Sequence, residues 1–337
     1  MSSELRKLHS KDEPRGEIQL GDVLIEGKTK IVYDLPEYKG CVSIKSKDRI
    51  TAGDGARAHD MEGKAVISNE TNAQLMQILN DAGIATHFIG KWSNDTFHAL
   101  HCHMIPIEWV IRRVATGSFL RRHPGIEEGH RFAPLKLETF FKDDANHDPQ
   151  WSREQLISAK LKCGNVVIGV DEVDIIEKMT LLIFEILEKA WAGANWALID
   201  MKIEFGVTAE SGEIVLADII DSDSWRLWPS GDKRLMVDKQ VYRDMADVTQ
   251  AGIETVKKNF QMVAEKVKCL SLSVYLCLSL FTCTHFFFSA CLCLLVPTSS
   301  LVPCLSLFTC THFFFSVCLC LLVPTSSLVH SLLLILL

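Results

Sequence analysis

The chain has 337 residues and a net charge of −7, and its charge is unevenly distributed. All charged side chains (35 Lys and Arg, 42 Asp and Glu) lie at or before Lys268. Residues 1–268 contain three cysteines, Cys41, Cys102 and Cys163, which excludes a disulfide scaffold and is typical of the reducing cytosol. Their net acidic charge excludes nucleic-acid binding driven by overall charge.

The two ends of the chain differ from this middle part. Residues 1–17 are polar and lack the apolar stretch of a secretory signal, so we expect a disordered leader. Residues 269–337 form an uncharged tail, in which the sequence of residues 277–303 recurs with two changes as residues 304–330. Two interpretations stay open for the tail: membrane-spanning or re-entrant segments, since it is long and apolar, and translated non-coding repeat, since no Lys or Arg flanks the segments. Its close cysteine pairs lack the spacing of zinc ligands.

The middle part opens with predicted strands. Apolar and polar residues alternate over residues 18–26, 29–35 and 41–46, which predicts a small antiparallel sheet. Helical spacing over residues 61–82, followed by Gly83, predicts the first long helix.

Further along, strands and helices alternate without a regular βαβ rhythm. The predicted elements are strands at 84–92, 107–115 and 136–141, a short helix capped by Ser152 and Gln155, a long helix at 171–195, a hairpin at 196–220 and a closing helix at 249–268. This order predicts an α+β fold with two lobes, residues 18–105 and residues 106–268.

The hairpin carries the most informative side chains. Asp200, Lys202 and Glu204 share one face of its first strand. If the turn centres on Ser211, Glu204 lies directly opposite Asp218 in the returning strand. Facing carboxylates destabilise a hairpin by up to about 1 kcal/mol unless a cation joins them, and Mg²⁺ with nucleotide phosphates prefers such oxygen ligands. Lys202 would then neutralise a phosphate. The alternative is an exposed acidic hairpin in a register shifted by one residue.

The segment from Gly21 to Thr29 nearly matches a P-loop but has one residue too many between its glycines. A P-loop also opens a helix, whereas residues 30–35 alternate as a strand. We therefore predict a glycine turn between two strands, with Lys28 and Lys30 on one face as a lid over phosphates. A surface hairpin with two solvated lysines is the alternative.

Four arginines surround a Thr-Gly-Ser turn in residues 112–122. Backbone N–H groups, a hydroxyl and a guanidinium can converge there on a phosphate monoester, and a basic surface strand is the alternative. In the sequence, Arg226 lies between Trp225 and Trp228, and an arginine between two large aromatic residues often binds a ligand. The polar loop that carries Asp54 either reaches a ligand or simply turns.

The usual motifs of covalent and zinc catalysis do not occur in the sequence: no G-x-S-x-G, no H-E-x-x-H, and no G-x-G-x-x-G after a strand. Phosphoryl transfer is the reaction class that remains, because it needs cationic side chains, a metal and correctly positioned substrates rather than a protein nucleophile. The lysines, arginines and carboxylates named above can supply these.

Six segments taken together resemble one family. They are Glu26–Lys30, Ser46–Gly55, Arg112–Leu120, Phe141–Pro149, Asp200–Gly206 and Asp218–Pro229. In their order and residue identities these segments are similar to SAICAR synthetase (phosphoribosylaminoimidazole-succinocarboxamide synthase), most of all to the synthetase half of the animal bifunctional enzyme. We find no counterpart of the AIR carboxylase domain of that enzyme in this sequence. The resemblance covers residues 18–268 and implies a kinase-like or ATP-grasp-like fold with ATP between the lobes.

The resemblance also implies a reaction and its residues. The reaction condenses the carboxyaminoimidazole ribotide CAIR with L-aspartate, using MgATP, to give SAICAR, ADP and phosphate in purine (IMP) biosynthesis by way of an acyl phosphate. Implied residues are Gly27, Lys28, Lys30, Met104, Glu108 and Lys202 for ATP, with Met104 to Glu108 as the hinge beside adenine; Glu204 and Asp218 for Mg²⁺; and Asp54, Arg112, Ser118, Arg226 and Arg243 for CAIR. Lys202, Arg226 and Asp54 are the implied catalytic residues, with Lys142 and Asp144 in support.

The expected partners are therefore CAIR and L-aspartate, with a homo-oligomer as an option, no nucleic acid, and a membrane only if the tail is genuine. We expect the chain in the cytosol. Two other functions stay open. One is an ATP-binding module that acts on another phosphorylated metabolite, and the other is an aberrant tailed isoform that is membrane-associated and retains only nucleotide binding.

Overall fold

The computed structural model describes residues 18–53 and 55–270, which belong to one compact unit, residues 1–277. The leader, Asp54 and the tail from residue 271 onward, with its repeat and cysteine pairs, lie outside the described residues. Two large antiparallel sheets, two small two-stranded sheets and the helices packed on them form the described part, which confirms the predicted α+β class.

A five-stranded sheet is built from the first hundred residues. Its strands, in spatial order, are β1 (Val23–Glu26), β2 (Lys30–Asp34), β3 (Cys41–Ser46), β7 (Thr96–Leu100) and β6 (Phe88–Lys91). Helix α2 (Lys64–Asp81) packs on this sheet, and its Leu75 and Leu79 join Phe97 in the main core. Gly83 follows the helix at φ +86°, which a residue with a side chain rarely adopts, so the predicted end of the helix is confirmed.

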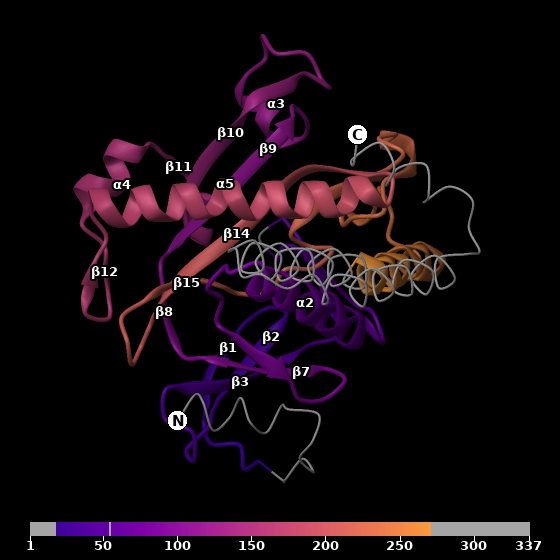
Figure 1. The fold of residues 1–337 in the computed structure, drawn as a ribbon. Coiled ribbons are helices and arrows are strands. Elements are labelled where there is room, and N and C mark those ends of the chain that lie inside the picture. The colour runs from indigo at the N-terminus through magenta and orange to yellow at the C-terminus, as the bar shows by residue number, and fades with distance from the viewer. Residues whose placement is uncertain (1–17, 54, 271–337) are drawn as a thin grey trace, which may run out of the picture. The chain divides into compact units, whose positions relative to one another are not determined.

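A seven-stranded sheet forms the other half of the described part. Its path is β11 (Gln150–Trp151), β10 (Arg131–Phe141), β9 (Ile107–Val114), β14 (Trp196–Thr208) and β15 (Ile214–Ala217), and both β8 (Cys102–Met104) and β16 (Trp225–Pro229) also pair with β14. Figure 1 shows α5 (Val170–Gly193) lying across this sheet. The buried stripe of α5 includes Val173, Ile183 and Leu187, because apolar residues at helical spacing face the strands.

Short elements connect these layers. They are β4 (Arg49–Ala52), β5 (Arg57–Asp60), α3 (Ser118–Arg122), η1 (Asp144–Asn146), α4 (Arg153–Ala159), β12 (Lys162–Cys163), β13 (Val166–Val167), η2 (Lys233–Leu235) and α6 (Gln240–Arg243). Helix α4 begins with the predicted capping box, in which Ser152 and Gln155 satisfy each other's backbone N–H groups.

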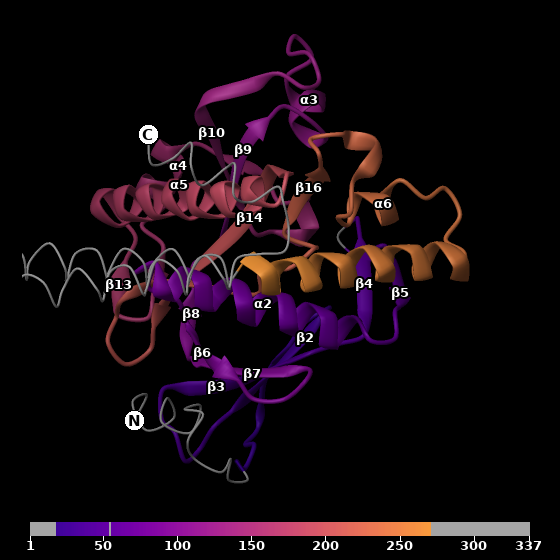
Figure 2. The same cartoon turned by 45° about the vertical axis from the view of Figure 1, so that its right-hand side comes forward.

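The predicted closing helix covers residues 250–270 and runs alongside α2 in both views (Figures 1 and 2). Its buried residues Ile253, Val256 and Phe260 form a second core with residues of β4, α6 and the start of α2. The closing helix therefore fixes β4 and α6 to α2. None of the helices in the described part of the chain has both the length and the apolar character needed to cross a lipid bilayer.

The predicted register of the β14–β15 hairpin is wrong by one residue. Glu204 faces Ala217, not Asp218, and Val207 faces Ile214. The reason lies in the turn, where Gly212 adopts φ +72° and its N–H bonds the carbonyl of Thr208 at 3.0 Å. This turn centres the hairpin between residues 210 and 211.

Candidate functional site

Residues of both sheets, α2 and α6 line one cavity of about 1110 Å³. The predicted residues among its lining are Gly27, Lys28, Lys30, Glu108, Arg112, Ser118, Lys142, Asp144, Lys202, Glu204, Asp218, Arg226 and Arg243. Met104, predicted to contact adenine, ends strand β8, is 38% exposed and does not line this cavity. Asp54 lies outside the described residues, although its neighbours Gly53 and Gly55 line the cavity.

The β1–β2 turn brings two lysines to one end of this cavity. The N–H of Gly27 donates to the carbonyl of Lys30 at 2.9 Å and closes the turn, so the strand–turn–strand prediction is confirmed. Lys28 Nζ donates to Asp144 Oδ2 at 2.8 Å, and Lys30 Nζ donates to Asp218 Oδ1. Both ammonium groups therefore pair with carboxylates from the second half of the described part. The Lys30–Asp218 pair is partly buried, whereas the Lys28–Asp144 pair is exposed to solvent.

The cavity face of β14 carries a closely connected charge network. Lys202 Nζ donates to Glu204 Oε1 at 2.6 Å and to Glu108 Oε1 at 3.0 Å. Lys142 Nζ donates to Glu204 Oε2 at 2.8 Å, so both oxygens of Glu204 have a lysine partner. Burial disfavours the charged form of Lys202, but Glu204, Glu108 and Asp218 outweigh it and raise its pKa.

Asp218 reaches the cavity by a route other than the predicted one. In a regular strand its side chain would point to the face opposite Glu204, because neighbouring residues alternate. Its backbone instead turns to φ +64° directly after β15. The side chain then accepts hydrogen bonds from Lys30 and from the N–H of Ile219, at 2.7 Å for the latter. Burial opposes ionisation, but Lys30 and Lys202 outweigh it and lower the pKa of Asp218.

Glu204 and Asp218 fit a divalent cation by the chemistry of their donor atoms. Both are carboxylates surrounded by ammonium groups, and Glu204 is 2% exposed. Residues 18–53 and 55–270 contain no group of three or more His, Cys, Asp or Glu side chains that could hold a metal by themselves. Mg²⁺ is commonly held in this way, by one or two carboxylates together with substrate phosphates.

A pair of arginines lies next along the cavity. Arg112, 2% exposed, donates to Glu138 Oε2 at 2.6 Å and to Asp200 Oδ2 at 2.7 Å. The same oxygen of Asp200 accepts from Arg226 at 2.7 Å, and Arg226 also donates to Gln240 at 3.2 Å. Two guanidinium groups therefore converge on one carboxylate.

Two expectations about the arginines need correction. Asp200 and Gln240 hold Arg226, rather than its two neighbouring tryptophans, whose side chains are buried. Of the four arginines around the Thr-Gly-Ser turn, Arg113 does not line the cavity and pairs with Glu188 at 2.6 Å. Alternation along β9 explains this, since it directs Arg112 and Arg113 to opposite faces.

Gly117, before α3, allows a close approach to Arg226. It has φ +60°, and a Cβ atom there would lie 2.4 Å from a terminal nitrogen of Arg226. A side chain at this position would displace the guanidinium from the cavity.

The far end of the cavity holds a cluster of buried charged residues, most of which the sequence did not predict. Lys64 Nζ lies 3.2 Å from Asp223 and 3.8 Å from Asp221, and Lys239 Nζ lies 3.3 Å from Asp223. Burial, then Arg243, lowers the pKa of Lys239. An anion would relieve this repulsion. The spacing of Lys239 and Arg243, four residues apart on one helical face, is the sequence feature that could have revealed them.

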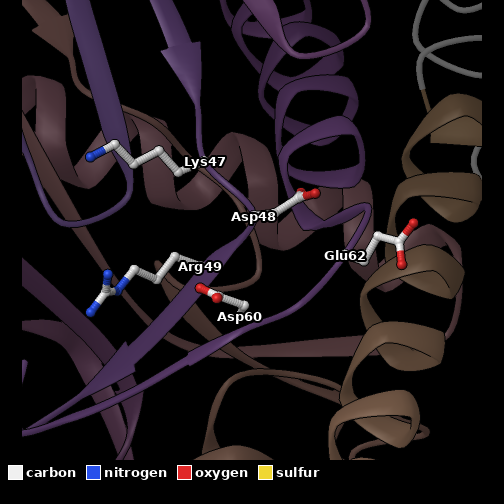
Figure 3. Close-up of a pocket in the computed structure, with 5 residues that line it drawn as sticks. All are labelled: Lys47, Asp48, Arg49, Asp60 and Glu62. Atoms are coloured by element: carbon white, nitrogen blue, oxygen red, sulfur yellow. The ribbon is translucent and has the colours of Figure 1, made fainter.

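A smaller pocket of about 420 Å³ lies outside this site (Figure 3). Asp48 accepts the N–H groups of Gly63 and Ala65, at 3.0 and 2.7 Å, and so caps α2. Lys47 donates to Glu26 at 2.6 Å. In Figure 3 the labelled side chains diverge, so the pocket has no convergent set of charges.

Comparison with known proteins agrees with the resemblance seen in the sequence. The family model described as SAICAR synthetase matches residues 23–260. A bifunctional phosphoribosylaminoimidazole carboxylase/phosphoribosylaminoimidazole succinocarboxamide synthetase of Drosophila melanogaster is 64% identical over 249 residues, which are 74% of this chain and 58% of that protein. A phosphoribosylaminoimidazole-succinocarboxamide synthase of Roseiflexus castenholzii is 47% identical over 74% of this chain and 97% of its own length.

The fold is shared as well. A solved structure of a type-2 SAICAR synthetase in complex with ADP aligns with a TM-score of 0.63 and 29% identity, covering 73% of this chain and 97% of that one. The chain spans less than two thirds of its bifunctional relative but nearly the whole of the single-function proteins. The chain therefore belongs to the SAICAR synthetase family.

Proposed function

We propose that this chain condenses CAIR with L-aspartate, using MgATP, to give SAICAR, ADP and phosphate in purine biosynthesis. One observation carries the proposal. A single cavity holds a carboxylate pair suited to Mg²⁺ beside four lysines at one end, and a set of arginines and lysines suited to an anionic second substrate beyond it. A protein that only binds a nucleotide would not need these additional arginines and lysines. The names of the relatives support the same activity.

ATP would lie between the two sheets. Lys28 and Lys30 of the β1–β2 hairpin, with Lys142 and Lys202, would donate to its phosphates. Bound Mg²⁺ would neutralise charge on the transferred phosphoryl group, held there by the two carboxylates described above. The solved relative with ADP supports a nucleotide site in this fold.

CAIR would occupy the middle and far end of the cavity. Arg112, Arg226 and Ser118 lie where they would bind and orient the imidazole ribotide, and Lys239 and Arg243 suit its phosphate. These residues would place the CAIR carboxylate next to the γ-phosphoryl group.

The reaction then needs no protein nucleophile. The CAIR carboxylate takes the γ-phosphoryl group from ATP, which breaks the bond between that group and ADP and forms an acyl phosphate. The amine of L-aspartate attacks the acyl carbon, a C–N bond forms, and phosphate leaves with the C–O electron pair. The amine loses a proton to solvent or to a cavity carboxylate.

We further propose that residues 18–105 and 106–268 act as nucleotide and substrate lobes, and that the enzyme works in the cytosol. The low number of cysteines in residues 1–268 supports a reducing compartment.

The test is ADP release by the full-length chain with MgATP and CAIR, with and without L-aspartate. We expect aspartate-dependent turnover that falls more than about 100-fold in Glu204→Gln and in Asp218→Asn, because either change removes a metal-binding charge. Glu188→Gln, whose carboxylate pairs with Arg113 away from the cavity, is the control and should retain turnover. A folded wild-type chain that binds ADP but shows no aspartate-dependent turnover would refute the ligase and leave the nucleotide-binding alternative.

A further inference from the structure

Asp218 owes its place in the cavity to an uncommon backbone conformation. Its φ of +64° lies in the left-handed region, which residues other than glycine rarely adopt. Without this turn its carboxylate would follow strand alternation to the face opposite Glu204. Something must therefore hold the peptide after Ala217 in this orientation.

His87 is placed to do so. It lies between α2 and β6, and its ring is buried at 3% exposure. Its Nε2 lies 3.0 Å from the backbone carbonyl oxygen of Asp218. Because a carbonyl only accepts, Nε2 must carry the proton and donate it.

The backbone around His87 is itself fixed. Its N–H donates to Leu216 O at 2.8 Å, and its carbonyl accepts from Leu100 N at 2.7 Å. Leu216 N in turn donates to Ala85 O at 3.0 Å. The ring also packs edge-on against Phe97, with centroids 5.7 Å apart. The imidazole is thus aimed at Asp218 from a rigid support, and these backbone bonds do not depend on the identity of the side chain.

We propose that His87 is a positioning residue for the metal site: its Nε2–H holds the Asp218 peptide so that the carboxylate faces the cavity beside Glu204. The inference rests on the proposed function, since that function gives Asp218 its metal. His87 touches neither substrate nor metal and acts only through the backbone of Asp218. Sequence reasoning missed it, because the two residues are 131 positions apart.

Two variants of the full-length chain separate the hydrogen bond from packing. His87→Met keeps a side chain of similar size and removes the donor, whereas His87→Gln places an amide N–H at a similar reach. The control is His98→Met, since His98 is a fully buried histidine of the same sheet, stacked on Trp92 and outside the cavity lining. Calorimetry gives two dissociation constants for each variant: ADP without Mg²⁺, and Mg²⁺ for the ADP-bound protein.

We expect His87→Met to weaken Mg²⁺ binding about 10-fold or more, the usual effect of losing a residue that orients a metal ligand, and to leave metal-free ADP binding within about 2-fold. His87→Gln and His98→Met should both stay within about 3-fold of wild type for Mg²⁺. Unchanged Mg²⁺ affinity in a folded His87→Met protein would overturn the inference. Equal weakening of both constants would also overturn it, because the role would then be merely structural.

Should His87→Met fail to fold, His87→Asn replaces it, since its shorter amide falls short of the carbonyl. Equal Mg²⁺ affinities of the Gln and Asn variants would then refute the inference. A wild-type protein whose ADP binding does not respond to Mg²⁺ would overturn the proposed metal site together with the role of His87. Wild-type ligase activity with Mg²⁺ affinity insensitive to His87 would overturn this inference alone.

Discussion

Glu138 on β10 is a buried carboxylate that holds two arginines of the cavity, Arg112 and Arg122. It accepts from Arg112 at 2.6 Å and from Arg122 at 2.7 Å, and its side chain has no exposed surface. Burial opposes ionisation of Glu138, but Arg112 and Arg122 outweigh it and lower its pKa. Glu138 lies outside the cavity lining, yet it fixes two arginines that form part of that lining.

We expect Glu138→Gln to lower the free energy of unfolding by about 3 kcal/mol, because it leaves a buried guanidinium with one carboxylate instead of two. CAIR binding should weaken as Arg112 loses its orientation. Urea unfolding and a CAIR titration measure the two effects. Glu188→Gln, which disrupts a more exposed pair with Arg113, should lose only about 1 kcal/mol and leave CAIR binding intact. Equal losses in the two variants would contradict this view of Glu138.

Asp238 gives the stability of the protein a predictable pH dependence. Its side chain is fully buried and accepts the N–H groups of Leu227 and Gln240 at 2.9 and 2.8 Å. Burial nevertheless raises its pKa to about 6. The folded state therefore holds this proton more tightly than the unfolded chain does, and the stabilisation from the protonated form is lost as the pH rises from about 4 through about 6.

Asp238→Asn removes this titration. We expect the free energy of unfolding of the wild type, minus that of the variant, to fall by roughly 2.4 kcal/mol between pH 4 and pH 7. Urea unfolding at several pH values measures it, and a constant offset from the lost hydrogen bond does not affect the slope. A difference that stays the same across this range would rule out the assigned titration.

At the scale of elements, the loop from β9 into α3 shapes the middle of the cavity. Gly117→Ala should displace Arg226, so we expect the KM for CAIR to rise about 10-fold or more while ADP affinity is unchanged, since a shift of 1 Å can cost more than this. Gly129→Ala is the matched control, because Gly129 also has a positive φ, +90°, but has open space where the Cβ would lie. A similar rise of KM in both variants would show backbone strain, rather than Arg226, to be the cause. Steady-state kinetics measure the KM for CAIR, and calorimetry measures the affinity for ADP.

Local pattern predicted the elements but not all of the contacts between them. Lys202 and Glu204 could be assigned to one strand face because alternation is a property of neighbouring residues. The register of the hairpin could not be predicted in this way, because it depends on the left-handed conformation of Gly212 in the turn. Glu138 and His87 escaped notice for a related reason. Their partners lie 26 and 131 residues away, and only the fold brings them together.

At the scale of the whole molecule, the closing helix joins parts that the sequence separates. Residues 250–270 cover a core shared by β4, α2 and α6, and each of these elements contributes to the cavity. The integrity of the site should therefore depend on this helix.

We expect a chain that ends at Cys277, the boundary of the compact unit, to unfold cooperatively and to bind MgADP as the full chain does. A chain that ends at Thr249 should lose several kcal/mol of stability, since burial of Ile253, Val256 and Phe260 is worth about 1.5–3 kcal/mol each. That is a large part of the total stability of a typical domain. Thermal unfolding of both chains tests this, and equal stability would show that the second core is dispensable.

The end of the cavity proposed for the nucleotide is close to electrical balance within the protein itself. Four lysines, Lys28, Lys30, Lys142 and Lys202, bond four carboxylates, Asp144, Asp218, Glu204 and Glu108. Such a surface offers no surplus positive charge to a free nucleotide, whose phosphates are strongly anionic. A nucleotide that arrives with its metal would carry less charge and would give the carboxylates a new partner as the lysines move to phosphate oxygens. If nucleotide binds here as proposed, the pairing that holds these side chains in place should favour its metal complex over the free anion, and binding would exchange one set of ionic partners for another.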